Sequence, residues 1–136
     1  MKPFTYLNEF LKTDIAPSST HGIGTFALRD LKVGEDVFIR WTGETKVYIL
    51  PKDEFNTLSE SSKFLVLKSY ENKEQYPYIW FRLFRDSYFN LSNPWAYVNT
   101  KETDGNVDSV TKKVIKPIKQ GEELFGTYNL ENTILK

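Results

Sequence analysis

Short apolar stretches separated by turn glycines constrain the fold of this chain more than any other feature. They predict strands over residues 25–28, 37–41 and 46–50, with turns at Gly34 and Gly43 between them. Aromatic residues make up 15% of the sequence, and aromatic and β-branched side chains favour half-buried, pleated surfaces. The chain is therefore expected to be mainly β, with short helices.

Helical signals occur at the start of the chain and in its middle. Residues 3–12 suit either a short amphipathic helix or an irregular strand. Pro51 suits the first turn of a helix, and Ser59 or Ser61 suits the cap of a second helix. The aromatic run over 76–84 predicts a strand that begins near its proline.

The closing segment, residues 113–129, reads as strand, turn and strand followed by a lone tyrosine. A strand is expected through Val114, Ile115 and Ile118, a turn at Gln120–Gly121, and a second short strand over 122–125. Tyr128 then stands alone, and such a tyrosine is by itself most often a half-buried ring. The glutamates beside turn glycines are expected to be solvated: Glu35, Glu44, Glu122 and Glu123.

Length and composition exclude several classes of protein. With 136 residues the chain suits one domain, 1–136. It has no cysteine and one histidine, so no metal site is expected. Formal net charge is zero, whereas general nucleic-acid and anionic-membrane binders normally carry a basic excess. No apolar run approaches the roughly 20 residues of a membrane span, and the first residues lack the features of a secretory signal, so residence inside a cell is the expectation.

Two short motifs each allow two interpretations. Gly22-x-Gly24 lacks the third glycine of a dinucleotide fingerprint, so it is either a tight turn or a loop that lets backbone approach a ligand. Asn99 is either a turn residue or an amide that offers a donor and an acceptor to a polar ligand. His21 on its own suits a turn or surface position.

Taken together and in order, four stretches resemble the SET domain family of protein lysine methyltransferases. The stretches are STHGIGTFALRDLKVGEDV, IRWTGET, SNPWAYVNT followed by Asn106, and IKPIKQGEELFGTY. They run from about residue 19 to 129, and residues 51–85 would be the family's variable insert. The chain is most similar to compact single-domain members, such as viral and bacterial ones, that lack zinc-binding flanking regions.

The resemblance implies a SET-domain, β-clip-like fold of small twisted sheets with a C-terminal pseudoknot. The last segment would thread beneath a loop formed by an earlier one. Asn99 would then lie next to Tyr128, and both would lie beside the Gly22/Gly24 turn. The implied activity is S-adenosylmethionine-dependent methyl transfer to a lysine side chain of a protein or peptide.

The resemblance also implies a role for particular residues. Tyr128 would be catalytic, with its hydroxyl beside the transferring methyl group. The implied cofactor-binding residues are His21, Gly22, Ile23, Gly24, Asn99 and Thr100. The implied residues of the substrate-lysine channel and its rim are Trp41, Trp95 and Tyr97. An apolar aromatic channel suits this chemistry because desolvation favours the neutral amine over the ammonium.

Two other interpretations remain open at this point. One is a catalytically silent SET-like scaffold that binds a peptide or protein, which is favoured by Trp41 and Thr100, where the family commonly has Tyr and His. The other is an unrelated β-rich domain whose motifs match by chance. Neither nucleic acid nor membrane is expected as a partner, and an exposed aromatic surface could support a homodimer. The expected compartment is the cytoplasm, or a host nucleus for a viral or secreted effector.

Overall fold

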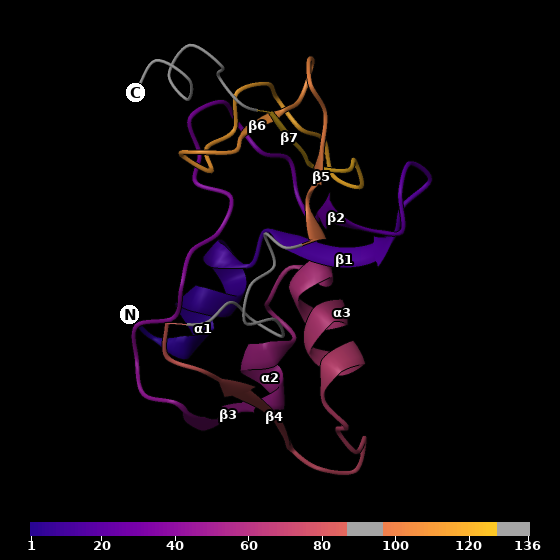
Figure 1. The fold of residues 1–136 in the computed structure, drawn as a ribbon. Coiled ribbons are helices and arrows are strands. Elements are labelled where there is room, and N and C mark those ends of the chain that lie inside the picture. The colour runs from indigo at the N-terminus through magenta and orange to yellow at the C-terminus, as the bar shows by residue number, and fades with distance from the viewer. Residues whose placement is uncertain (87–96, 128–136) are drawn as a thin grey trace. The chain divides into compact units, whose positions relative to one another are not determined.

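The structure, a computed structural model, describes residues 1–86 and 97–127 (Figure 1). The chain divides into two compact units, each built from two separate stretches. The insert unit comprises Met1–Leu11 with Ile39–Asn93, and the motif unit comprises Lys12–Phe38 with Pro94–Lys136. The described elements are small sheets and short helices, as the sequence predicts. The prediction of one domain over 1–136 stays a prediction.

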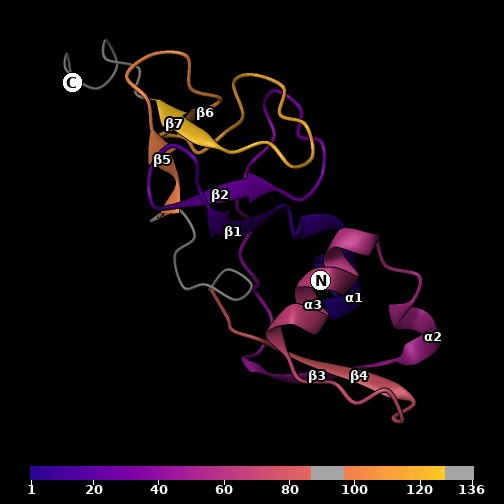
Figure 2. The ribbon, with the colours of Figure 1, turned by 90° about the vertical axis from the view of Figure 1, so that its right-hand side faces the viewer.

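The insert unit pairs two strands and places helices on one side of them. β3 (Lys46–Pro51) and β4 (Tyr78–Leu83) are antiparallel, in a register from Lys46↔Leu83 to Pro51↔Tyr78. Between them come α2 (Lys52–Phe55) and α3 (Glu60–Ser69), while α1 (Pro3–Thr5) and the π-helical turn η1 (Tyr6–Phe10) begin the unit. Figure 2 shows these helices on one side of the β3–β4 pair. Residues 3–10 are thus helical rather than an irregular strand.

The core of the insert unit is apolar and centred on aromatic rings. Its buried residues are Tyr6, Leu7, Leu11, Trp41, Leu50, Phe55, Leu58, Leu65, Val66, Ile79, Phe81 and Leu83. The rings of Tyr6 and Tyr48 each pack against Trp41 in a T-shaped arrangement, with centroids 5.4 and 5.5 Å from that of the indole. The indole N–H donates to the Glu44 carbonyl at 3.1 Å. A Cβ at Gly43 would collide with the indole, so this position needs glycine.

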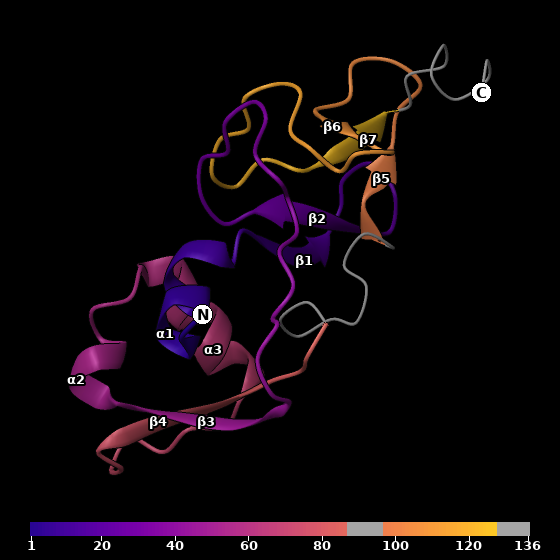
Figure 3. The ribbon, with the colours of Figure 1, turned by 90° about the vertical axis from the view of Figure 1, so that its left-hand side faces the viewer.

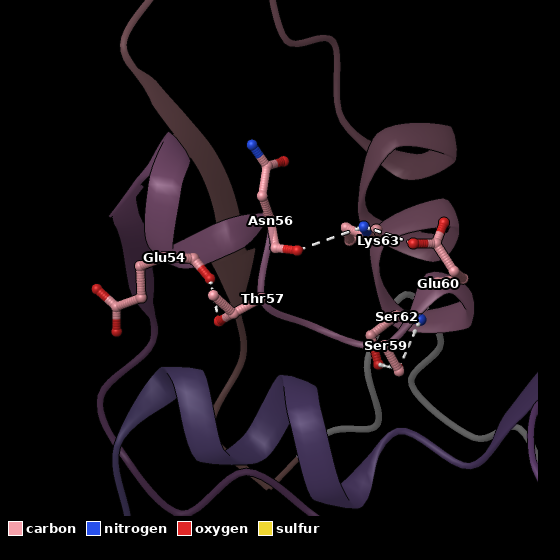
Figure 4. A network of polar contacts seen from close by, with 7 residues as sticks. All are labelled: Glu54, Asn56, Thr57, Ser59, Glu60, Ser62 and Lys63. Atoms are coloured by element: carbon pink, nitrogen blue, oxygen red, sulfur yellow. Dashed lines mark hydrogen bonds and ion pairs between the residues drawn. The ribbon is translucent and has the colours of Figure 1, made fainter.

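Ser59 and Ser62 begin α3 and connect it to η1. Figure 4 shows the hydrogen bonds between these two serines at the start of the helix. The Ser59 hydroxyl accepts the Ser62 backbone N–H at 3.3 Å and donates to the Ser62 hydroxyl at 2.9 Å. The Ser62 hydroxyl donates in turn to the Leu7 carbonyl at 2.7 Å, and its side chain is fully buried. Ser59 is therefore the N-cap, one of the two serines the sequence suggested.

Replacing Ser59 with alanine is expected to lower the free energy of unfolding by about 1 kcal/mol. The change removes the acceptor of the Ser62 N–H and the partner of the Ser62 hydroxyl. Denaturant unfolding measures the loss, and Thr57→Ala is the matched control because Thr57 bonds only within its own exposed turn. Equal stability of S59A and T57A would contradict the assigned cap.

The motif unit consists of two small sheets. β1 (Thr13–Pro17) and β2 (Ile23–Ala27) are antiparallel, in a register from Thr13↔Ala27 to Pro17↔Ile23. In the second sheet β7 (Phe125–Thr127) lies between β5 (Asn99–Thr100) and β6 (Val107–Asp108), parallel to both. Figure 3 shows the β5, β6 and β7 segments together. The core residues are Ala27, Leu31, Val37, Val107, Val114, Ile118 and Leu124.

The order β5–β7–β6 makes the chain cross over itself. Residues 101–106 connect the two outer strands and so must pass over β7, which comes later in the sequence. The Lys101 N–H donates to the Gly126 carbonyl and the Asn106 N–H to the Phe125 carbonyl, both at 2.9 Å. As far as Thr127, the closing segment therefore lies between β5 and β6 and is bonded to the loop that connects them, whereas the C-terminal pseudoknot that the resemblance implies stays a prediction. Tyr128 lies outside the described residues.

Two of the predicted strands are wrong. Residues 37–41 form no strand because the chain passes from one unit to the other at Phe38, so Val37 and Trp41 enter different cores. Residues 114–118 make only isolated bridges, from Val114 to Val107 and from Ile118 to Leu31. Pro117, which has no N–H to donate, interrupts that stretch.

Other predictions differ only in their bounds. The turn at Gln120–Gly121 is confirmed, with φ of +87° at the glycine. The strand after this turn begins later than predicted, at Phe125. Before it, Glu122 and Leu124 each make one backbone hydrogen bond to β2, which is too little for a continuous strand. The strand predicted over 76–84 is β4, which starts directly after Pro77.

Candidate functional site

The turn between β1 and β2, together with the first two residues of β2, carries four of the six predicted cofactor-binding residues. The Ser18 N–H donates to the Gly22 carbonyl at 2.8 Å, which closes the turn, and Gly22 has φ of +49°. The Ser18 hydroxyl oxygen accepts the N–H groups of Thr20 at 3.1 Å and His21 at 3.3 Å. This bonding leaves His21, Gly22 and Ile23 exposed along the outside of the turn.

The carboxamide of Asn99 reaches this turn from β5. Its Nδ2 atom lies 2.8 Å from Glu123 Oε2, 3.1 Å from the His21 carbonyl oxygen and 3.3 Å from Ser18 Oγ. The two shorter contacts account for both hydrogens of Nδ2. The predicted proximity of Asn99 to the Gly22/Gly24 turn is therefore present in the structure, and Asn99 is more than a local turn residue.

Glu123 is the residue at this site that sequence reasoning missed. Its carboxylate accepts the Ser18 hydroxyl through Oε1 at 2.7 Å and the Asn99 amide through Oε2 at 2.8 Å. The prediction of a solvated turn residue is wrong for Glu123, because Glu123 lies before β7 and bridges to Phe26 of β2. Its position in the GEEL stretch of the closing segment was the available signal.

Glu35, also predicted to be solvated, is partly exposed but makes specific bonds. Lys12 donates to Glu35 Oε2 at 3.1 Å, and the Lys32 N–H donates to Oε1 at 2.9 Å. Burial raises the pKa of Glu35, but these bonds and the two lysine charges outweigh burial and hold the pKa below its ordinary value. Glu44 and Glu122 are exposed, as predicted.

Asn106 bonds the backbone of the closing segment on both sides of Leu124. Its Nδ2 donates to the Glu123 carbonyl at 3.0 Å, and its Oδ1 accepts the Phe125 N–H at 2.7 Å. The neighbouring Gly105 fits against β7 so closely that a Cβ there would lie 2.7 Å from Thr127 Cβ and 2.8 Å from the Phe125 carbonyl oxygen. These contacts set the position of the backbone that leads to Tyr128.

Charged side chains also hold the loop of residues 101–106, which connects β5 to β6 across β7. The Lys101 ammonium lies 4.0 Å from the centroid of the Phe125 ring, which is a cation–π contact. Lys116 forms an ion pair with Asp104, and this bond together with the lysine charge holds the pKa of the exposed Asp104 carboxyl below its ordinary value. Among residues 1–86 and 97–127, no group of three or more metal-ligating side chains could hold a metal ion.

The remaining predicted site residues are not all brought to this point. Thr100 follows Asn99 in β5 and is exposed, and Tyr97 is exposed beside that strand. Trp41 is 2% exposed and belongs to the core of the insert unit, so its role in a channel stays a prediction. Trp95 and Tyr128 lie outside the described residues, and their roles also stay predictions.

Comparison with known proteins gives limited likeness. No protein-family model matches the chain. A search of curated proteins also found no match. Of the helices in the described part of the chain, none is both long and apolar enough to cross a membrane.

Three solved structures show partial overlap with the fold. A candidate histone methyltransferase of Plasmodium falciparum shares 15% identity over 87% of this chain and 93% of its own, with a TM-score of 0.38. Polycomb Repressive Complex 2 of Chaetomium thermophilum, bound to GSK126, shares 24% identity over 91% of this chain, with a TM-score of 0.38. The apo form of the same complex, in an autoinhibited state, shares 24% identity over 91% of this chain, with a TM-score of 0.35. This chain spans 17% and 16% of those two chains, and at such scores the function has to be argued from the residues.

Proposed function

We propose that this protein transfers a methyl group from S-adenosylmethionine to a lysine side chain of a protein substrate. One observation supports the proposal most strongly: the Asn99 carboxamide bonds both the His21 carbonyl and the Glu123 carboxylate. Three of the four stretches that resemble SET motifs therefore meet at one side chain. Chance motifs in an unrelated β-rich domain give no reason for that meeting.

The residues at this point suit a ligand that carries hydrogen-bond donors and positive charge. Asn99 Oδ1 has no hydrogen-bond partner among the described residues, so an acceptor is available there. A Cβ at Gly22 would meet nothing within 4 Å, and the turn from His21 to Ile23 is exposed. S-adenosylmethionine has amine and hydroxyl donors and a sulfonium charge, so the exposed turn and Asn99 would hold it.

Bound there, S-adenosylmethionine would supply an electrophilic methyl that a neutral lysine amine attacks in line, as the carbon–sulfur bond breaks and the amine loses a proton. The protein's part is to position the cofactor and the lysine amine and to exclude water from them. An apolar surround favours the neutral amine because desolvation penalises the ammonium. By resemblance, the Tyr128 hydroxyl positions the reacting groups, and Asn106 and Gly105 fix the backbone just before it.

Replacing Asn99 with alanine is expected to weaken binding of S-adenosylmethionine about tenfold, because one hydrogen bond to the ligand is lost. Calorimetric titration of the folded variant measures the change. Asn56→Ala is the matched control, since Asn56 is exposed and belongs to the insert unit. Affinity that is equal in the wild type, N99A and N56A would contradict the placement of the ligand.

A further inference from the structure

We propose that Glu123 is a positioning residue that determines which end of the Asn99 carboxamide faces the ligand. The identity of that ligand rests on the proposed function, whereas the orientation of the carboxamide does not. In this arrangement Glu123 holds the NH₂ end of Asn99 inward. Oδ1 is thereby presented outward, and the site selects a hydrogen-bond donor on the ligand.

The chemistry of the two inward neighbours allows only one orientation. An ionised carboxylate and a backbone carbonyl accept hydrogen bonds and donate none. Asn99 Nδ2 lies 2.8 Å from the Glu123 carboxylate and 3.1 Å from the His21 carbonyl, so both neighbours require the donor end. A flipped carboxamide would place Oδ1 against two acceptors and lose both bonds. A neutral side chain that can also donate would remove this constraint at the Glu123 side.

Ser18 fixes the other oxygen of the carboxylate. Its Oγ accepts two backbone N–H groups of the turn, from Thr20 and His21, which leaves its own proton for Glu123 Oε1 at 2.7 Å. The bonds therefore run in sequence from the turn to Ser18, from Ser18 to Glu123, and from Asn99 to Glu123. Each carboxylate oxygen has its own donor, so neither can rotate away without losing a bond.

Gly24 and the backbone around Glu123 complete this arrangement. A Cβ at Gly24 would lie 2.5 Å from Glu123 Oε2 and 2.8 Å from Cδ, so the glycine makes room for the carboxylate. The Glu123 backbone is held by Asn106 Nδ2 at 3.0 Å, and the next residue, Leu124, donates to the Thr25 carbonyl at 2.8 Å. Gly24 is buried and has this role inside the protein, and its contact with a cofactor stays a prediction.

The first test compares two single changes of the same chemistry. E123Q keeps the shape of the side chain but replaces one acceptor with a donor. E122Q is the matched control, because Glu122 is exposed and its carboxylate accepts the Lys119 N–H of its own turn. Binding of S-adenosylmethionine is expected to weaken about tenfold in E123Q and to stay within about twofold of the wild type in E122Q.

A double-mutant cycle separates positioning from a general effect on structure. In the N99A background no carboxamide remains to be oriented, so adding E123Q is expected to weaken binding by no more than about twofold. Equal losses from E123Q with and without Asn99 would overturn the proposal, because Glu123 would then act independently of the amide. If E123Q does not fold, S18A replaces it in the same cycle, with the same expected and contrary results.

A second measurement needs no ligand. The side-chain amide signals of Asn99 are identified in an ¹H–¹⁵N spectrum as the pair that N99A lacks. We expect E123Q to shift that pair and E122Q to leave it in place. If the pair shifts but the wild type binds no S-adenosylmethionine, the proposed function fails and the orienting role of Glu123 stands. If the wild type binds, and E123Q neither weakens binding nor shifts the pair, the orienting role fails and the proposed function stands.

Discussion

Replacing Tyr128 with phenylalanine is expected to reduce methyl transfer about a hundredfold or more while leaving affinity for S-adenosylmethionine nearly unchanged. The variant keeps the aromatic ring and removes only the hydroxyl that, by resemblance to SET domains, lies beside the transferring methyl. Small errors of position in such a reaction cost about two orders of magnitude in rate. Labelled methyl transfer to a lysine-bearing protein substrate measures turnover, and calorimetry measures affinity.

Tyr70→Phe is the matched control for this change. Tyr70 lies in the insert unit, and its hydroxyl donates to the Arg82 carbonyl at 2.7 Å. It also loses one hydroxyl, but we assign it no part in the chemistry, so its turnover is expected to equal that of the wild type. Unchanged turnover in Y128F would refute the catalytic role of Tyr128. If neither protein transfers methyl although both bind the cofactor, the silent-scaffold interpretation gains support.

Replacing Trp41 with alanine is expected to lower the stability of the insert unit by about 3–5 kcal/mol, the usual cost of removing a buried aromatic side chain. The indole is 2% exposed, contacts the rings of Tyr6 and Tyr48, and donates to the Glu44 carbonyl. Its removal leaves a cavity that these neighbours fill only in part. Denaturant unfolding, followed by circular dichroism, measures the loss.

Ile49→Ala serves as the control in the same unit, because Ile49 is 61% exposed on the outer side of β3. Its effect is expected to stay within about 0.5 kcal/mol. A loss below about 1 kcal/mol in W41A would show that the indole is not the centre of this core. The turnover of Trp41→Phe, compared per folded molecule, then tests whether the same side chain also takes part in the predicted lysine channel.

Local signals in the sequence predicted the elements that depend on local chemistry. Ser59 caps α3 because a serine hydroxyl can accept a free N–H in the first turn of a helix. The short apolar stretch after the turn at Gly43 predicted the strand over 46–50, which is β3. Pro77 marked the start of β4. Each of these predictions needed only a few neighbouring residues.

Predictions that depend on distant partners were less successful. Residues 37–41 have the composition of a strand, yet Val37 and Trp41 are buried in different units, and nothing local indicates where a chain passes between units. Glu123 resembled any glutamate beside a turn glycine, and only its contacts with Ser18 and Asn99 distinguish it from Glu122. The partners of Glu123 lie 105 and 24 residues away in sequence.

The motif order carried information that single motifs did not. Asn99, the His21 turn and the GEEL stretch were each ambiguous alone, and their arrangement in the resembling family correctly indicated that Asn99 would lie beside the turn. The same resemblance implies that Gly24 binds the cofactor, which stays a prediction, and the structure adds that a Cβ at Gly24 would collide with the Glu123 carboxylate. A motif thus indicated which residues gather, but not which atom each of them contacts.

Calorimetric titration of the wild-type protein with S-adenosylmethionine and with S-adenosylhomocysteine tests the central claim most directly. The proposed function predicts saturable binding of both compounds, since they share every hydrogen-bonding group and differ only in the methyl and its charge. Binding that weakens in N99A would place the ligand at the turn that Asn99 contacts. If the protein is shown to be folded and neither compound binds to it in the titration, the assignment as a methyltransferase is contradicted.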